Sequence, residues 1–117
     1  MDNRMTCGQP ARKTVRMILR TWSARATEAG AAQYCDYFEH TLLPELRTRT
    51  GFVGAQLATR PLDGLIEITA HTTWASLDAI RAFAGDDPTA AKVEPEALAM
   101  LEDSDPAVVH RDVRVSG

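Results

Sequence analysis

The stretch Phe52–Trp74, FVGAQLATRPLDGLIEITAHTTW, decides the fold because it has the pattern of a β-hairpin. Its middle, Pro61-Leu-Asp-Gly64, contains the Asp-Gly pair that favours a tight hairpin turn. The pattern predicts strands over Phe52–Arg60 and Leu65–Trp74. Alternate residues of the second strand form one mostly apolar face, which indicates that the hairpin packs on a core. The residues of that face are Ile66, Ile68, Ala70, Thr72 and Trp74.

A strand and a long helix precede the hairpin. Residues Val15–Arg25 predict a strand, and Thr27, just after it, is a favourable N-cap. The helix is expected over about Glu28–Arg47, with a kink or the start of a new turn at Pro44, because proline cannot donate to the helical ladder. Its apolar face follows the i, i+3, i+4, i+7 rule of a packed helix. The residues of that face are Ala31, Tyr34, Cys35, Phe38 and Leu42.

The C-terminal part predicts one helix, two shorter helical pieces and a strand. Ser76 caps a helix expected over Leu77–Ala84. Asp86-Asp87-Pro88 is expected to open a short helical turn, since proline suits the first position of a helix. A further short helix is expected over Pro95–Glu102, and the last strand over Ala107–Val115.

The element order is β-α-β-β-α-β, the ferredoxin-like plan of an α+β domain with two helices on one face of a four-stranded antiparallel sheet. Residues 15–117 are expected to form this single domain, and residues 1–14 a flexible tail. The sheet face that the helices leave open carries Met17 and Leu19 beside polar residues. Such a mixed face is most simply buried against a second copy of the chain, so a homodimer is expected.

Composition disfavours several classes of protein. The net charge is −3 and the chain has no cluster of Lys and Arg, which disfavours nucleic-acid binding. The longest apolar runs are too short for a membrane helix, and the N-terminus lacks the apolar segment of a secretory signal. Two unpatterned cysteines, Cys7 and Cys35, fit a reducing, cytoplasmic compartment better than a disulfide scaffold.

Five segments of the chain together match a known sequence pattern. They are Ile18-Leu-Arg-Thr-Trp-Ser, Leu43-Pro-Glu-Leu-Arg, Gly51-Phe-Val-Gly-Ala, Trp74-Ala-Ser-Leu-Asp-Ala-Ile-Arg-Ala-Phe-Ala-Gly85 and Pro95-Glu-Ala-Leu-Ala-Met-Leu, with His110 on the final strand. Over residues 15–115 the chain resembles the antibiotic biosynthesis monooxygenase family. The resemblance implies a dimeric α+β barrel in which two sheets pack face to face, with a pocket between sheet and helices in each subunit. The family includes cofactor-independent oxygenases of aromatic polyketides, haem-degrading enzymes and proteins of no known activity, so the fold carries over more readily than the chemistry.

Haem-degrading members of this family use an asparagine on the first strand, a tryptophan at the end of the third strand and a histidine after the second helix. Trp74 matches the tryptophan, but Trp22 or Ser23 stands where the asparagine belongs, and Val93 stands near the position of the histidine. Neither Trp22 nor Ser23 can replace the asparagine, and Val93 cannot replace the histidine. Haem degradation is therefore disfavoured.

Motifs for phosphate, dinucleotide or nucleophile chemistry do not occur in the sequence. The histidines His40, His71 and His110 lack the spacing of metal ligands. We therefore expect neither a metal nor a cofactor. We expect His71 to point towards the dimer seam, away from the face that carries Trp74.

Two polar residues are the candidates for catalysis. His110 could act as a general base, because imidazole titrates near neutral pH; the alternative is a histidine at the surface or at an interface. Arg20 lies between apolar neighbours on its strand and could hold an anion with two donors. The alternative for Arg20 is a salt bridge to a carboxylate of a helix.

Five aromatic residues are candidates for substrate binding, with a place in the core as the alternative. They are Trp22, Trp74, Tyr34, Phe38 and Phe83. The family resemblance implies a cofactor-independent monooxygenase of a small aromatic or polyketide-type substrate, in which we expect His110 to remove a proton and Arg20 to hold the anion. The alternatives are a non-oxidative cyclase or isomerase in the same pocket, and a ligand-binding dimer without catalysis.

Overall fold

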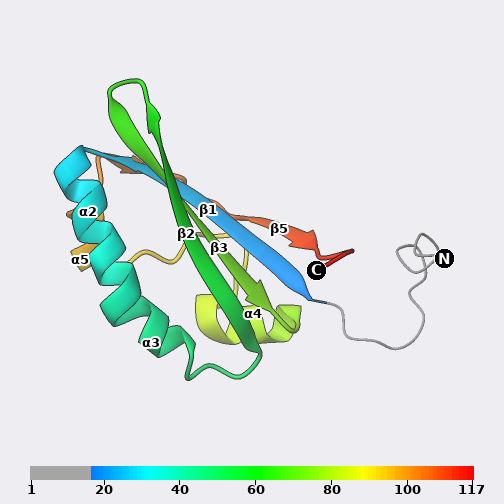
Figure 1. Cartoon of the computed structure of the whole chain (residues 1–117). Coiled ribbons are helices and arrows are strands. Elements are labelled where there is room, and N and C mark those ends of the chain that lie inside the picture. Colours follow the sequence, from blue (N-terminus) through cyan, green and yellow to red (C-terminus); the bar gives the residue numbers. More distant parts are fainter. Residues whose placement is uncertain (1–16) are drawn as a thin grey trace.

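The computed structural model describes residues 17–117, so the tail predicted for residues 1–14 lies outside the described residues. Figure 1 shows a twisted sheet with the helices packed on one of its faces. The strands are β1 (Ile18–Ala26), β2 (Phe52–Leu62), β3 (Leu65–Trp74), β4 (Asp103–Ser104) and β5 (Val109–Asp112). The helices are α2 (Glu28–Tyr37), the π-helix η1 (Phe38–Leu42), α3 (Leu43–Leu46), α4 (Leu77–Ala84) and α5 (Pro95–Leu98).

The sheet has the strand order β2-β3-β1-β4, with β5 also paired to β1, and every pair is antiparallel. The predicted ferredoxin-like α+β fold is therefore confirmed. Because β1 lies between β3 and the two C-terminal strands, it brings distant parts of the chain together. Arg20 on β1 is paired with Thr72 on β3 and with His110 on β5.

The hairpin of β2 and β3 turns where the sequence predicts. Asp63 and Gly64 have φ angles of 50° and 81°. Positive values at both central residues are those of a two-residue hairpin turn of type I′. β2 runs beyond its predicted end at Arg60 and includes Pro61. An edge strand tolerates proline because the missing N–H can face solvent rather than a partner strand.

Helix α2 begins as predicted, with the Thr27 hydroxyl accepting a hydrogen bond from the Gly30 N–H at 3.0 Å. α2, η1 and α3 follow one another without a break, and the wide π turns of η1 end just before Pro44. Proline has no N–H for the helical ladder, and its ring collides with the carbonyl one turn earlier. The widened turns form an irregularity where the sequence predicts a kink or a new turn, and Pro44 lies in the first turn of α3.

The buried face of α2 differs from the prediction at one position. Cys35 is exposed, and Tyr37 is buried together with Tyr34 and Phe38. Around a helix with 3.6 residues per turn, Tyr37 lies about 60° from Tyr34, whereas Cys35 lies about 100° away on the other side. Cys35 therefore falls outside the stripe that the sheet covers.

The loop between α4 and α5 has one hydrogen-bonded turn where the sequence predicts a short helical turn at Pro88: the Ala90 N–H donates to the Asp87 carbonyl at 3.2 Å, and no helix follows from it. The Asp87 carboxylate accepts hydrogen bonds from the N–H and the hydroxyl of Thr89, at 3.1 and 2.7 Å. This local turn competes with a helix because a side chain supplies the acceptor. The loop then meets the C-terminal segment, where Ala90 forms a bridge to Ala107.

The predicted last strand, Ala107–Val115, is shorter than expected and is preceded by the two-residue strand β4. β4 and β5 both pair with β1, and Pro106 between them has no N–H to give to a partner strand. α5 is also shorter than predicted. It ends at Leu98, and the N–H of Glu102 donates to the Arg25 carbonyl in β1 at 2.8 Å.

Alternation along β1 gives the sheet two different faces. Arg20, Trp22 and Ala24 are buried, whereas Leu19 and Thr21 remain partly exposed. Trp22 and Ala24 share a core with Tyr34 and Phe38 of the helices, and Figure 1 shows the helices on one side of the sheet. None of the helices in residues 17–117 is both long and apolar enough to cross a lipid bilayer.

Candidate active site

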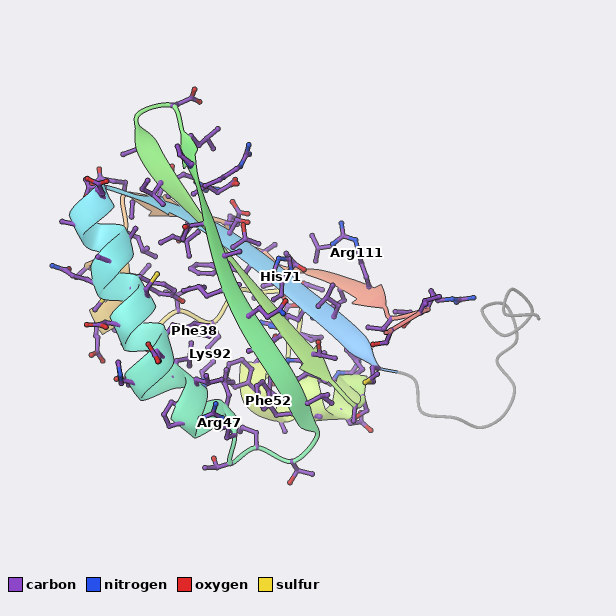
Figure 2. All side chains as sticks on the ribbon, viewed as in Figure 1. Phe38, Arg47, Phe52, His71, Lys92 and Arg111 are labelled. Atoms are coloured by element: carbon purple, nitrogen blue, oxygen red, sulfur yellow. The ribbon has the colours of Figure 1, made fainter. Side chains whose placement is uncertain are left out.

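A cavity lies between the sheet and the helices. Its empty space, with the open mouth included, is about 490 Å³. Aromatic side chains and two cationic side chains stand out in its wall: Trp22, Tyr34, Phe38, Phe83, Arg20 and Lys92. Figure 2 shows Phe38 and Lys92 in this space between the long helix and the sheet.

Arg20 is the buried charged residue of the cavity wall, with an exposed fraction of 6%. Its Nη1 donates to the Pro88 carbonyl at 2.6 Å, and its Nη2 donates to the Ala90 carbonyl at 3.2 Å. No carboxylate within residues 17–117 forms a salt bridge with Arg20, so the alternative predicted for it does not occur there. Burial lowers the pKa of Arg20, because desolvation penalises the charged form.

His110 lies next to Arg20, with its Nε2 at 3.0 Å from Arg20 Nη1. A guanidinium can only donate, so Nε2 is the acceptor and the neutral imidazole carries its proton on Nδ1. Burial and the positive charge of Arg20 lower the pKa of His110, which favours this neutral form. His110 is not among the described residues that line the cavity, so its effect on a ligand passes through Arg20.

The aromatic part of the wall is a connected set of rings. The Trp22 Nε1–H donates to the Asp105 carbonyl at 2.9 Å, and the ring centroids of Trp22 and Tyr34 are 6.0 Å apart. Tyr34 and Phe38 have centroids 6.4 Å apart. Burial raises the pKa of Tyr34, so its hydroxyl stays protonated at neutral pH. The structure thus brings these predicted residues and Phe83 to one cavity, and substrate contact by them stays a prediction.

Trp74, also predicted to bind substrate, is fully buried and is not among the described lining residues. Its ring stacks on Phe83 at a centroid distance of 5.3 Å and meets Phe52 edge-on at 5.4 Å. Its Nε1–H donates to Thr72 Oγ1 at 2.8 Å. Trp74 therefore supports the cavity wall from behind Phe83, and direct contact with a substrate stays a prediction.

Lys92 is a cavity residue that sequence reasoning missed. Its Nζ lies 4.7 Å from the centroid of the Phe83 ring, and the Cζ atoms of Arg49 and Arg20 lie 5.5 and 5.9 Å from the same centroid. Cations close to an aromatic ring are attracted by its quadrupole. No periodic signal marks Lys92, because it belongs to an irregular loop whose path is set by backbone hydrogen bonds to residues 106–108.

His71 lies on the opposite face of the sheet from the cavity. Its Nδ1 is 3.4 Å from the Thr21 hydroxyl, on the face that the helices leave open. In Figure 2 Arg111, which also belongs to that face, points away from the helices. Within residues 17–117 no group of three His, Cys, Asp or Glu side chains is placed to hold a metal ion.

No model of a protein family matches the sequence, and no curated protein matches it. Solved structures do match. A dimeric ferredoxin-like protein from an uncultured marine organism has a TM-score of 0.60 at 14% identity, over 89% of this chain and 100% of that chain. SnoaB, a cofactor-independent oxygenase from Streptomyces nogalater, has a TM-score of 0.53 at 17% identity, over 89% of this chain and 96% of that chain. A monooxygenase from the gene ActVA-Orf6 of Streptomyces coelicolor, in complex with the ligand Nanaomycin D, has a TM-score of 0.50 at 17% identity, over 88% of each chain.

Fold and cavity together define a class of protein: a ferredoxin-like α+β domain with a cavity between the sheet and the helices. Within this class the chain has the fold of the oxygenase and the monooxygenase named above. A structure described as a putative antibiotic biosynthesis monooxygenase from Caulobacter crescentus also matches, with a TM-score of 0.53 at 18% identity, so the resemblance to that family is confirmed for the fold. Identities of 14% and 17% establish no chemistry, which has to be argued from the site.

Proposed function

We propose that the chain is a cofactor-independent monooxygenase of a small aromatic substrate with an acidic hydroxyl or enol, such as a hydroquinone or an anthrone. Arg20 carries this proposal: a buried guanidinium lies in the wall of an aromatic cavity, without a carboxylate partner in residues 17–117. A fixed cation at that place lowers the pKa of a bound hydroxyl and stabilises the oxygen anion that forms.

The proposed reaction begins when the substrate hydroxyl gives its proton to solvent at the cavity mouth and Arg20 holds the anion. The electron-rich ring then transfers one electron to O₂, and the radical and superoxide combine at a ring carbon. At the methylene carbon of an anthrone the resulting hydroperoxide loses water, so that CH₂ and O₂ become C=O and H₂O. The substrate supplies all the electrons, so the reaction needs no further reductant.

The surrounding side chains support this chemistry in two ways. The rings of Trp22, Tyr34, Phe38 and Phe83 offer an apolar surface on which an aromatic substrate can stack. His110 keeps the Arg20 guanidinium in place, which makes it a positioning residue in this proposal. The sequence predicts His110 as a general base. In that role His110 would first have to break the hydrogen bond between its Nε2 and Arg20, because this bond occupies the Nε2 lone pair.

Oxygen uptake tests the proposed activity. We expect purified protein to accelerate O₂ consumption with at least one member of a panel of hydroquinones and anthrones, above the rate without protein. With ¹⁸O₂ one labelled oxygen atom should appear in the product. Arg20→Lys should lower kcat and raise KM, because lysine keeps the charge but loses the planar fork of donors.

Two results would contradict the proposal. Conversion of a panel member without O₂ uptake would favour a cyclase or isomerase in the same cavity. Equal rates for wild type and Arg20→Lys with every substrate would remove Arg20 from the chemistry. The matched control is Arg81→Lys, because the Arg81 side chain is 51% exposed and, among the described residues, its salt bridge is to Asp78 on its own helix.

We also propose that the chain forms a homodimer through the open face of the sheet. This face combines polar residues with Leu19 and with Val109, which is 50% exposed. Exposed apolar side chains on an otherwise polar face are typical of a face that a second copy covers. The dimeric ferredoxin-like neighbour supports this assignment.

Light scattering tests the dimer. At micromolar concentration the wild type should have about twice the mass of one chain, and Val109→Asp should shift the population towards the monomer, since an unpaired charge is costly to bury. The matched control is Leu98→Asp, because Leu98 is 48% exposed but lies in α5, away from the open face. A monomeric wild type, or an unchanged mass for Val109→Asp, would contradict the proposed interface.

A further inference from the structure

We infer that the cavity takes an aromatic acid: a flat ring system whose reacting oxygen binds Arg20 and whose carboxylate binds Lys92. This inference rests on the proposed function and adds the charge of the substrate. A substrate that carries both groups has two negative charges once its hydroxyl proton has left. The cavity offers one cationic side chain for each of them.

Arg20 keeps hydrogen-bonding capacity for a ligand. Within residues 17–117 its side chain makes three hydrogen bonds, to Pro88, Ala90 and His110, and all three partners are neutral. A guanidinium has more N–H donors than three, so donors remain for an oxygen anion. A buried cation with neutral partners leaves its charge uncompensated, which favours an anion in the adjoining cavity.

Lys92 provides the second charge. Its ammonium group lies over the ring of Phe83, 4.7 Å from the centroid, and Arg20 approaches the same ring at 5.9 Å. The attraction of the ring holds the flexible lysine side chain beside the cavity. No carboxylate within residues 17–117 pairs with Lys92, and none of the described residues that line this cavity is acidic.

Two carboxylates near Lys92 disfavour one of the two places where the ligand carboxylate could bind. Glu45 and Glu94 line a smaller neighbouring cavity, which shares Phe83 and Lys92 with the first. Glu45 is already paired with Arg49, at 2.8 Å between Oε2 and Nη2. Like charges repel, so these acids disfavour a ligand carboxylate in the neighbouring cavity. We therefore expect the ligand carboxylate to bind Lys92 from the cavity that Lys92 shares with Arg20.

Binding of matched acids and amides tests the inference without any turnover. Isothermal titration calorimetry at pH 7.5 compares 2-naphthoate with 2-naphthamide, and anthracene-2-carboxylate with its amide, which differ in charge but hardly in shape. At least one carboxylate should bind wild type about tenfold more tightly than its amide, because hydrogen bonds to charged groups are stronger than neutral ones.

A pair of variants locates the charge effect. Lys92→Gln should weaken binding of the carboxylate about tenfold and leave binding of the amide unchanged. Lys92 lies in a loop and is exposed, so this change should leave the fold intact. Arg81→Gln removes the same charge from an exposed position of α4 and should change neither affinity.

The outcomes separate this inference from the proposed function. Amides that bind as tightly as the acids, a complete lack of binding by both, or an unchanged carboxylate affinity in Lys92→Gln would overturn the inference. Carboxylates that bind as expected in a protein without O₂ uptake would leave the inference standing and remove the monooxygenase. If the protein takes up O₂ with neutral phenols and the carboxylates do not inhibit this uptake, the monooxygenase stands and the inference of an aromatic acid is overturned.

Discussion

Replacing His110 by alanine should lower kcat by about 10²-fold, whereas His110→Gln should retain most of the wild-type activity. The reason is the contact between His110 Nε2 and Arg20 Nη1 at 3.0 Å. Alanine removes the acceptor and lets the guanidinium shift, and a misplacement of about 1 Å can cost about 10²-fold in rate. The glutamine carbonyl can accept the same hydrogen bond but cannot serve as a base at neutral pH. Steady-state O₂ uptake with the best substrate measures both variants.

The acid limb of the pH profile gives a second readout for His110. Its pKa is lowered by burial and by Arg20, so the histidine stays neutral and the contact with Arg20 persists at pH 7. As pH falls below about 6.5, the unperturbed histidine value, and through the lowered pKa, protonation removes the acceptor and places two positive charges together. Wild-type activity should therefore decline in that range, and His110→Gln should lose this decline.

A general base would behave differently. If His110 takes the proton of the substrate, glutamine should be as inactive as alanine, with both variants about 10²–10⁴-fold below wild type. That result would support the role predicted from the sequence. Melting temperatures of both variants serve as the control, because a large loss of stability in either one would move the explanation from chemistry to folding.

Trp74→Ala should lower the free energy of unfolding by about 3–5 kcal/mol, the usual cost of deleting a buried tryptophan. The ring is fully buried between Phe52 and Phe83, and its N–H is bonded to Thr72. A loss of this size is a large part of the stability of a small domain, about 5–15 kcal/mol. Urea denaturation followed by circular dichroism measures it.

The conservative variant Trp74→Phe separates a core role from a ligand role. Phenylalanine keeps a ring beside Phe83 and loses the N–H bond to Thr72, so it should cost less than alanine and leave ligand affinity near that of wild type. A Trp74→Ala protein as stable as wild type, with ligand binding abolished, would show instead that Trp74 belongs to the substrate-binding surface.

Local chemistry in the sequence determined much of the fold. The Asp63-Gly64 turn, the Thr27 cap and the alternation of β1 each depend on residues close together in the chain. The alternation alone places Arg20 and Trp22 on the same face of β1. Alternation thus relates Arg20 to Trp22, and the helical period relates Tyr34 to Phe38. All of the aromatic candidates except Trp74 line the cavity together with Arg20.

Tertiary structure decided the parts of the site that depend on contacts between distant residues. Arg20 and His110 are ninety positions apart, and only the pairing of β1 with β5 shows that His110 Nε2 bonds to Arg20 rather than facing the cavity. Lys92 lies in a loop without a periodic pattern, and hydrogen bonds to residues 106–108 fix its path. Trp74 has the side chain of a ligand-binding residue, but the packing of Phe83 over it separates it from the cavity. Alternation tells which face of a strand a side chain takes, whereas its depth and its partner across the sheet depend on how the whole chain packs.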